Sequence, residues 1–107
     1  MSETRVRYIE RRIERIKEAL ATIGPMRPGS LTRQYKDPKS QSGSYWQISY
    51  TRVMKSHTEY VRQESVPGIR RQIAAYKRFK NLTEQWIDAS IEASKLKMQI
   101  AKKAGSA

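Results

Sequence analysis

The apolar positions at the start of the chain recur every three or four residues. They are Val6, Ile9, Ile13, Ile16, Leu20 and Ile23. This spacing predicts a helix over residues 1–24 with one narrow apolar stripe, of the kind that packs against another helix. Gly24 and Pro25 end this helix, because glycine supplies a left-handed cap and proline cannot continue it.

The middle of the chain changes to a period of two. The clearest stretch alternates apolar and polar side chains in the order Trp46, Gln47, Ile48, Ser49, Tyr50 and Thr51. Such alternation predicts a strand with one apolar and one polar face. Together with similar stretches on either side, it predicts an antiparallel meander of three strands, about 30–36, 44–52 and 56–62. The polar loop over 37–43 and a short hairpin across 53–55 connect them.

The last segment returns to a helical period. Apolar residues recur at steps of three or four from Ile69 to Ile100, and no glycine or proline interrupts the run to Lys103. We therefore predict one long helix over 66–103, followed by a disordered tail over 104–107. At 1.5 Å per residue this helix is about 50 Å long, more than a three-stranded sheet covers. The surplus packs on the first helix, packs on a second copy of the chain, or lies in solvent.

These elements predict a single α+β domain over 1–103, in the order helix, three-stranded antiparallel sheet, long helix. The two helices are expected to pair through their apolar stripes in a coiled-coil-like manner. A second, partial stripe of Ile87, Ile91 and Met98 on the long helix suggests a homodimer as well.

The chain is strongly basic, with 22 Lys and Arg against 10 Asp and Glu and a net charge of +12 over 107 residues. A polyanion is the natural partner for such a chain, because neutralised phosphates release their condensed counterions. The absence of cysteine excludes disulfides and thiolate zinc sites. No apolar run approaches the roughly 20 residues of a membrane span, so we expect a cytoplasmic protein, associated with the nucleoid if it binds DNA.

The positive charge is densest early in the last helix. Its members are Arg70, Arg71, Lys77, Arg78 and Lys80, and no acidic residue occurs from Val66 to Thr83. Helical spacing places Arg70, Lys77 and Lys80 roughly along one side, with Arg71 and Arg78 on a neighbouring ridge. We predict that this cluster contacts phosphates, since a merely solvated helix usually mixes charges of both signs.

The polar side of the sheet is the second candidate surface. We predict groove contacts from Arg33, Gln34, Lys36, Gln47, Ser49, Arg52 and Lys55, because small sheets can read base edges in the major groove. An ordinary solvated sheet face has a similar composition. The opposite register is also open, and it would turn Tyr45 outward as a stacking platform for single strands or RNA.

Chemistry beyond binding has little support in the sequence. His57 is the one histidine, no cysteine accompanies it, and no glycine-rich phosphate loop is present. The carboxylates of Glu84, Asp88 and Glu92 recur at steps of four, which favours ion pairing with a basic helix over a cation site. We therefore expect no enzyme activity, no metal, no cofactor and no small-molecule substrate.

Several short motifs resemble a family of short bacterial and archaeal proteins of unestablished function that are often encoded near transposases. The motifs are Pro28-Gly-Ser-Leu31, Gly43-Ser-Tyr-Trp46, Ile48-Ser-Tyr50, Thr58-Glu-Tyr-Val61 and Ala75-Tyr-Lys-Arg-Phe-Lys80. The resemblance covers about residues 25–86. Many members of that family carry cysteines between the first two strands, where this chain has none, so turn chemistry must hold the loop here.

The predicted architecture also resembles, more loosely, the three-stranded DNA-binding modules of tyrosine recombinases, whose sheet lies in the major groove. That analogy is one of architecture. The sequence thus predicts a nucleic-acid-binding protein, with double-stranded DNA favoured and RNA as an alternative. A second alternative is an assembly module that docks other proteins through its heptad-like helices.

Overall fold

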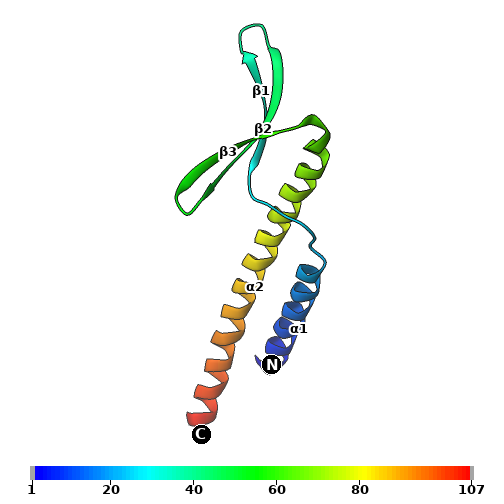
Figure 1. Ribbon diagram of the computed structural model, residues 1–107. Coiled ribbons are helices and arrows are strands. Elements are labelled where there is room, and N and C mark those ends of the chain that lie inside the picture. The colour runs from blue at the N-terminus through cyan, green and yellow to red at the C-terminus, as the bar shows by residue number, and fades with distance from the viewer. Residues whose placement is uncertain (1, 107) are drawn as a thin grey trace. The chain divides into compact units, whose positions relative to one another are not determined.

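The computed structural model of the protein describes residues 2–106 and confirms the predicted order of elements (Figure 1). The elements are α1 (Ser2–Ala21), β1 (Ser30–Asp37), β2 (Ser42–Arg52), β3 (Lys55–Val61), a short 3₁₀ turn (Gln63–Ser65) and α2 (Val66–Ser106). The class is α+β, with a three-stranded antiparallel sheet between two helices in the sequence. Helix α2 continues to Ser106, so residues 104–106 are helical where we expected a disordered tail. The last tail residue lies outside the described residues.

The chain divides into two compact units where the sequence led us to expect one domain. The helical unit consists of residues up to Ile23 together with those from Arg78 onward. The sheet unit is Gly24–Lys77. Each unit therefore has a core and a surface of its own, and the two are described separately.

In the helical unit, α1 packs antiparallel along the second part of α2 (Figure 1). The core is formed by Ile9, Ala89 and Ala93, with Ile13 and Leu96 packed against it. The small alanine side chains on α2 receive the larger isoleucines of α1, which is how alternating sizes fill a helix interface. The predicted pairing of the two apolar stripes is present within this unit.

In the sheet unit, the strand order is β1-β2-β3, with both neighbouring pairs antiparallel. Residues 42–49 of β2 pair with β1, while residues 46–52 pair with β3. The three strands therefore lie side by side only over residues 46–49 of β2. Beyond this overlap each hairpin continues as a two-stranded ribbon (Figure 1).

The core of the sheet unit lies beneath this overlap. Ile48 is fully buried and packs with Val61, Val66 and Ile73, and Leu31, Trp46 and Ile69 surround them. The start of α2 thus covers one face of the sheet. Gly29 is required where the chain enters β1, because a Cβ there would lie 2.7 Å from Cγ1 of Ile48 and its φ is +143°.

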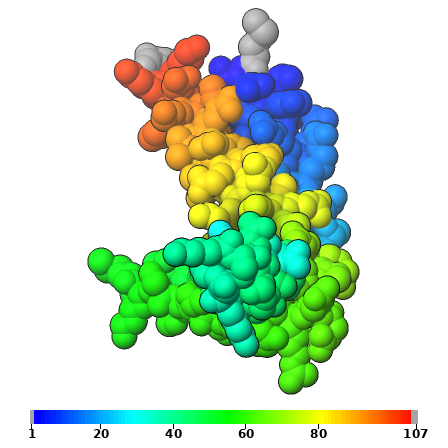
Figure 2. All heavy atoms as spheres, turned by 90° about the horizontal axis from the view of Figure 1, so that it is seen from above, coloured from blue at the N-terminus to red at the C-terminus, as the bar shows by residue number. Residues whose placement is uncertain are grey.

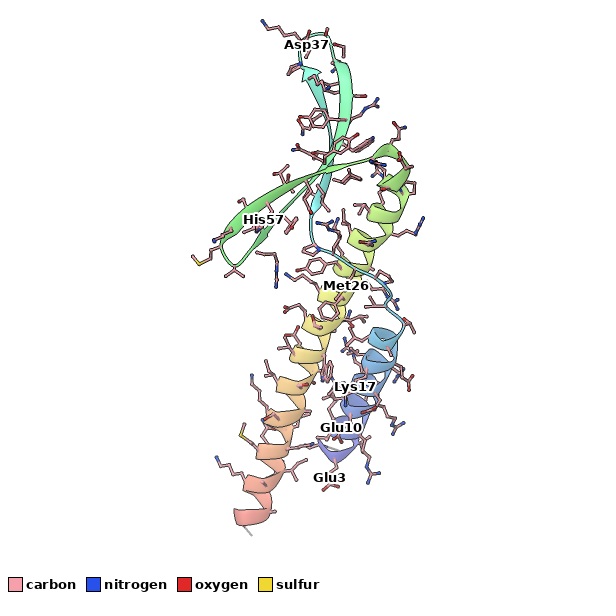
Figure 3. All side chains as sticks on the ribbon, viewed as in Figure 1. Glu3, Glu10, Lys17, Met26, Asp37 and His57 are labelled. Atoms are coloured by element: carbon pink, nitrogen blue, oxygen red, sulfur yellow. The ribbon has the colours of Figure 1, made fainter. Side chains whose placement is uncertain are left out.

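The two hairpins turn by different means. At the β1–β2 end, labelled by Asp37 in Figure 3, the Asp37 carboxylate accepts hydrogen bonds from the backbone N–H groups of Lys39 and Ser40 and from the Ser40 hydroxyl. These bonds form the Asx-type turn expected for a loop without cysteines. At the β2–β3 end, Val53 and Met54 alone connect the strands, both with positive φ.

Candidate nucleic-acid interface

One face of the sheet is left uncovered by the helix of its own unit. Strand alternation and register place eleven side chains on it. They are Ser30, Thr32, Gln34 and Lys36 from β1, Tyr45, Gln47, Ser49 and Thr51 from β2, and Ser56, Thr58 and Tyr60 from β3. We call these residues the open face. They supply hydroxyls, two amides, two phenols and one ammonium group, and no carboxylate.

Few of the polar groups on the open face are used internally. The Gln34 amide donates to the Thr32 hydroxyl at 3.1 Å, and the hydroxyls of Ser49 and Thr58 lie 3.4 Å apart. The Gln47 side chain, in the middle of the overlap, has no hydrogen-bond partner among the described residues. Because a glutamine amide both donates and accepts, it can pair with complementary groups such as the edge of a base.

The register corrects part of the predicted groove-contact set. Gln34, Lys36, Gln47 and Ser49 lie on the open face as expected. Arg33 does not join them, because it is paired with Trp46 on the side that α2 covers, while Arg52 and Lys55 form the cross-strand pair at the tip of the β2–β3 hairpin. The reason is the strand period of two, which sends neighbouring residues to opposite faces.

Arg33 lies opposite Trp46 within the overlap, whereas Arg52 and Lys55 lie at the end of the β2–β3 ribbon. The Arg33 guanidinium lies 5.8 Å from the Tyr35 ring centroid and donates to the Ser44 hydroxyl at 3.2 Å. Arg52 and Lys55 form the last cross-strand pair before the β2–β3 turn. Cations thus border the open face at the ends of both hairpins, with Lys39 in the β1–β2 turn.

Tyr45 lies on the open face together with Gln47, so the two side chains are not the alternatives that the sequence led us to expect. Both have odd numbers on one strand, so a single register exposes both. Tyr45, Tyr60 and Lys36 line a shallow hollow with Ser44. Tyr60 is 69% exposed. Sequence reasoning missed Tyr60 because its strand offers no clear alternation of its own, and the pairing with β2 alone assigns its face.

The predicted helix cluster separates into three locations. Arg70 and Lys77 line one hollow beside the start of β1, with Gly29, Ser30 and Leu31 on its other side. The Arg70 guanidinium also lies 5.2 Å from the Trp46 ring centroid. Arg71 lines a different hollow, with Gly24 and Pro25.

Arg78 and Lys80 belong to the helical unit. There the Arg78 guanidinium donates to the Thr22 hydroxyl at 3.4 Å. The ridge that the sequence suggested for Arg71 and Arg78 is therefore divided between the two units. Of the five cations, Arg70 and Lys77 are the two that the structure brings to one hollow.

The carboxylates of the sheet unit are all engaged by neighbouring groups. Glu59 accepts from the Arg27 guanidinium, Glu64 lies 3.9 Å from Arg62, and Asp37 accepts its turn bonds. The Arg27 hydrogen bond holds the pKa of Glu59 below its ordinary value, and the Ser40 hydroxyl does the same for the pKa of Asp37.

Ten basic side chains therefore face three satisfied acids in the sheet unit. Eight of them have no carboxylate partner among the described residues. They are Arg33, Lys36, Lys39, Arg52, Lys55, Arg70, Arg71 and Lys77. This excess of positive charge lies in the same unit as the open face.

In the helical unit, ion pairs join α1 to α2. Arg5 of α1 donates to Glu92 of α2 at 2.8 Å, and Lys97 of α2 donates to Glu10 of α1 at 3.1 Å. The expectation that the regularly spaced acids of the long helix pair with a basic helix is confirmed for Glu92. Positive charge therefore serves partly to join the two helices in this unit.

Among residues 2–106, no three His, Asp or Glu side chains gather as a metal site. Within the same residues, neither helix is long and apolar enough to cross a membrane.

Comparisons with models of known protein families, with curated proteins and with solved structures find no match to this chain. The resemblance to proteins encoded near transposases thus stays a prediction. The candidate interface rests on the chain's own residues.

Proposed function

We propose that this protein binds nucleic acid through its sheet unit, and that double-stranded DNA is the favoured form. The observation that carries the proposal is that one unit contains both features: eight cations that have no carboxylate partner, and an open face that has no carboxylate. Phosphates neutralise the cations, and the hydroxyl and amide groups of the open face hydrogen-bond to base edges.

The dimensions of the sheet favour the DNA major groove. Adjacent strands are about 4.8 Å apart, so the outer strands of the overlap are separated by roughly 10 Å. The major groove of B-DNA is about 12 Å wide, whereas the corresponding groove of A-form RNA is too narrow for side chains to read. Gln47 lies in the central strand of this overlap, flanked by Thr32 and Tyr60.

A mobility shift over a salt series tests this proposal. Labelled duplex DNA, duplex RNA and single-stranded DNA of equal length are titrated at salt concentrations from about 50 to 200 mM. We expect the affinity for duplex DNA to fall by about a thousandfold or more if six to ten phosphates are contacted. Stronger retention of RNA or of single-stranded DNA would identify that nucleic acid, in place of duplex DNA, as the ligand. A flat salt response would contradict the electrostatic basis of the proposed binding.

Gln47→Ala separates base contact from phosphate contact. We expect it to reduce the preference among duplex sequences while leaving the salt dependence unchanged, because it removes an amide and no charge. Gln99→Ala is the matched control, since it removes the same amide from an exposed position of the helical unit. Equal sequence preference in the Gln47→Ala variant and the wild type would exclude Gln47 as a reader.

A second candidate function is self-association through α2, and the exposed stripe on this helix favours it. Ile87, Ile91 and Met98 are 51%, 49% and 63% exposed, although they are apolar. With Ser94 they follow steps of four, three and four, which is a heptad seam. A second copy in antiparallel orientation would place Ile87 opposite Met98 and Ile91 opposite Ser94.

The charges beside this seam are self-complementary in the same orientation. Asp88 directly follows Ile87, and Lys95 follows Ser94, so both flank the seam on one side. An antiparallel pair places Asp88 of each copy opposite Lys95 of the other, and such flanking pairs select orientation in coiled coils. In a parallel pair this correspondence is lost.

Sedimentation measures this association. We expect Asp88→Lys to shift the protein towards the monomer, and Asp88→Lys with Lys95→Asp to restore the dimer, because the exchange re-creates both pairs. A wild-type protein that stays monomeric at high micromolar concentration would exclude the dimer. An exchange variant no better than the single variant would exclude the antiparallel register.

A further inference from the structure

The turn between β2 and β3 holds two apolar side chains that are not buried when the chain folds. Val53 is 86% exposed and Met54 is 98% exposed. The space-filling view shows the green segment around this turn projecting from the sheet unit (Figure 2). Neither side chain belongs to the core of its unit, so burial does not explain them.

The backbone of this turn is also unfavourable for these residue types. Val53 has φ +49° and Met54 has φ +64°, so both central residues are left-handed, as in a type I′ hairpin turn. Asn-Gly is the usual sequence for this turn, and a β-branched residue is the least suited to positive φ. Folding and solubility both favour other residues here, which points to a requirement in a bound state.

The surroundings of the turn are cationic and lack acids. Arg52 and Lys55 flank the two apolar residues as the closing cross-strand pair. Behind them, Tyr50 stacks on His57 with ring centroids 5.0 Å apart, and Figure 3 labels His57 on this hairpin. The nearest carboxylate on the strand, Glu59, is held by Arg27.

We propose that this turn is a wedge that enters a nucleic-acid duplex, with Met54 and Val53 inserted at a base step and Arg52 and Lys55 on the flanking phosphates. The inference rests on the proposed function of the sheet unit. Apolar side chains, methionine among them, are used in this way to unstack a step and bend the duplex. The unbranched, polarisable methionine side chain adapts to an irregular site such as a partly opened base step.

An anionic lipid surface is the other polyanion that an apolar tip with flanking cations fits. Duplex nucleic acid is favoured because the same unit carries the open face, whose amides and hydroxyls have complementary partners on base edges. Only two apolar residues project at the turn, and its strand neighbours Thr51 and Ser56 are polar. Lipid binding is therefore an outcome of the test below.

The test exploits the turn itself. Val53→Asn with Met54→Gly installs the preferred type I′ pair, so we expect the melting temperature of the sheet unit to stay equal or rise while the apolar tip is removed. Met54→Leu is the conservative control that keeps an apolar tip. Binding and bending are measured together on a duplex of about 30 base pairs with donor and acceptor dyes at its ends.

We expect the wild type and Met54→Leu to bend the duplex. The Asn-Gly variant should leave it straight, bind roughly tenfold more weakly and keep the same salt dependence, because no cation is lost. If the wild type binds without bending, or if the Asn-Gly variant bends DNA equally, the wedge is excluded while the proposed function stands. If the wild type does not bind a duplex at all, the proposed function itself fails.

Vesicles with and without phosphatidylserine complete the experiment. We expect the wild type and the Asn-Gly variant to show equal retention on the vesicles. Wild-type retention on anionic vesicles that the Asn-Gly variant loses, with equal DNA binding by both, would overturn the wedge in favour of a lipid anchor.

Discussion

The two units are nearly equal in length, and both are basic, yet they use their charges differently. In the helical unit, carboxylates on α1 and α2 pair with cations on the facing helix, as Arg5 does with Glu92. In the sheet unit, three acids are satisfied locally by Arg27, Arg62 and the β1–β2 turn. The comparison teaches that the balance of charges locates the excess: the helical unit has 12 basic and seven acidic residues, whereas the sheet unit has 10 basic and only three acidic residues.

Core substitutions give the largest expected difference between the units. Ile48 and Ile9 are both almost fully buried, at 0% and 2% exposure, and lie in separate cores. Truncation to alanine costs about 2–5 kcal/mol at such sites. We expect Ile48→Ala to unfold the sheet unit and abolish DNA binding, and Ile9→Ala to destabilise the helical unit first.

Each unit contains one tryptophan, which makes this prediction measurable. Trp46 reports on the sheet unit and Trp86 on the helical unit, so denaturation is followed by fluorescence in Trp46→Phe and Trp86→Phe backgrounds. Identical loss of both signals in both core variants would show that the units unfold as one, contrary to this expectation.

Charge reversal should give the next largest effect. Arg70→Glu with Lys77→Glu removes the two cations that share a hollow beside β1, whereas Arg7→Glu with Arg11→Glu makes the same change in net charge on α1. We expect roughly 100-fold weaker DNA binding for the first pair and only a few-fold change for the second. Affinity is measured by fluorescence anisotropy at 0.1 M salt. Equal losses would mean that total charge matters and location does not.

The smallest expected effect concerns acid pH. Because Arg27 lowers the pKa of Glu59, its carboxylate stabilises the folded sheet unit above the ordinary glutamate pKa, near 4.3. That contribution is lost as the pH falls through the lower, folded value. Carboxyl NMR titration should show a Glu59 midpoint below the ordinary value in the wild type and a higher midpoint in Arg27→Gln. Equal Glu59 midpoints in the two proteins would show that Arg27 does not cause the lowered pKa of Glu59.

The sequence predicted the elements well because their cause is local. The alternation from Trp46 to Thr51 and the three-to-four spacing from Val6 to Ile23 each depend on one segment alone. The strand pairing needed information from two segments at once. Nothing within β3 itself specifies whether Thr58 or His57 shares a face with Ser49, and the observed register selects Thr58.

The division into two units could not be predicted from the sequence, for a related reason. The apolar spacing of α2 runs unbroken from Ile69 to Ile100, although Ile73 packs in one core and Ala89 in the other. A continuous helical pattern does not indicate in which core each turn of the helix packs. The positive φ of Val53 and Met54 also ran against local preference, and residues that oppose local preference are the ones that sequence reasoning misses.

The composition of the open face has a consequence for how the protein would search DNA. Ten of its eleven residues are uncharged, so under the proposed function the attraction to DNA would come from the bordering cations and would be the same for every sequence. Such attraction permits one-dimensional sliding. Discrimination would then come from short-range hydrogen bonds whose strength hardly changes with ionic strength. Salt should therefore set how long the protein stays on DNA, while the order of its preferred sites stays the same.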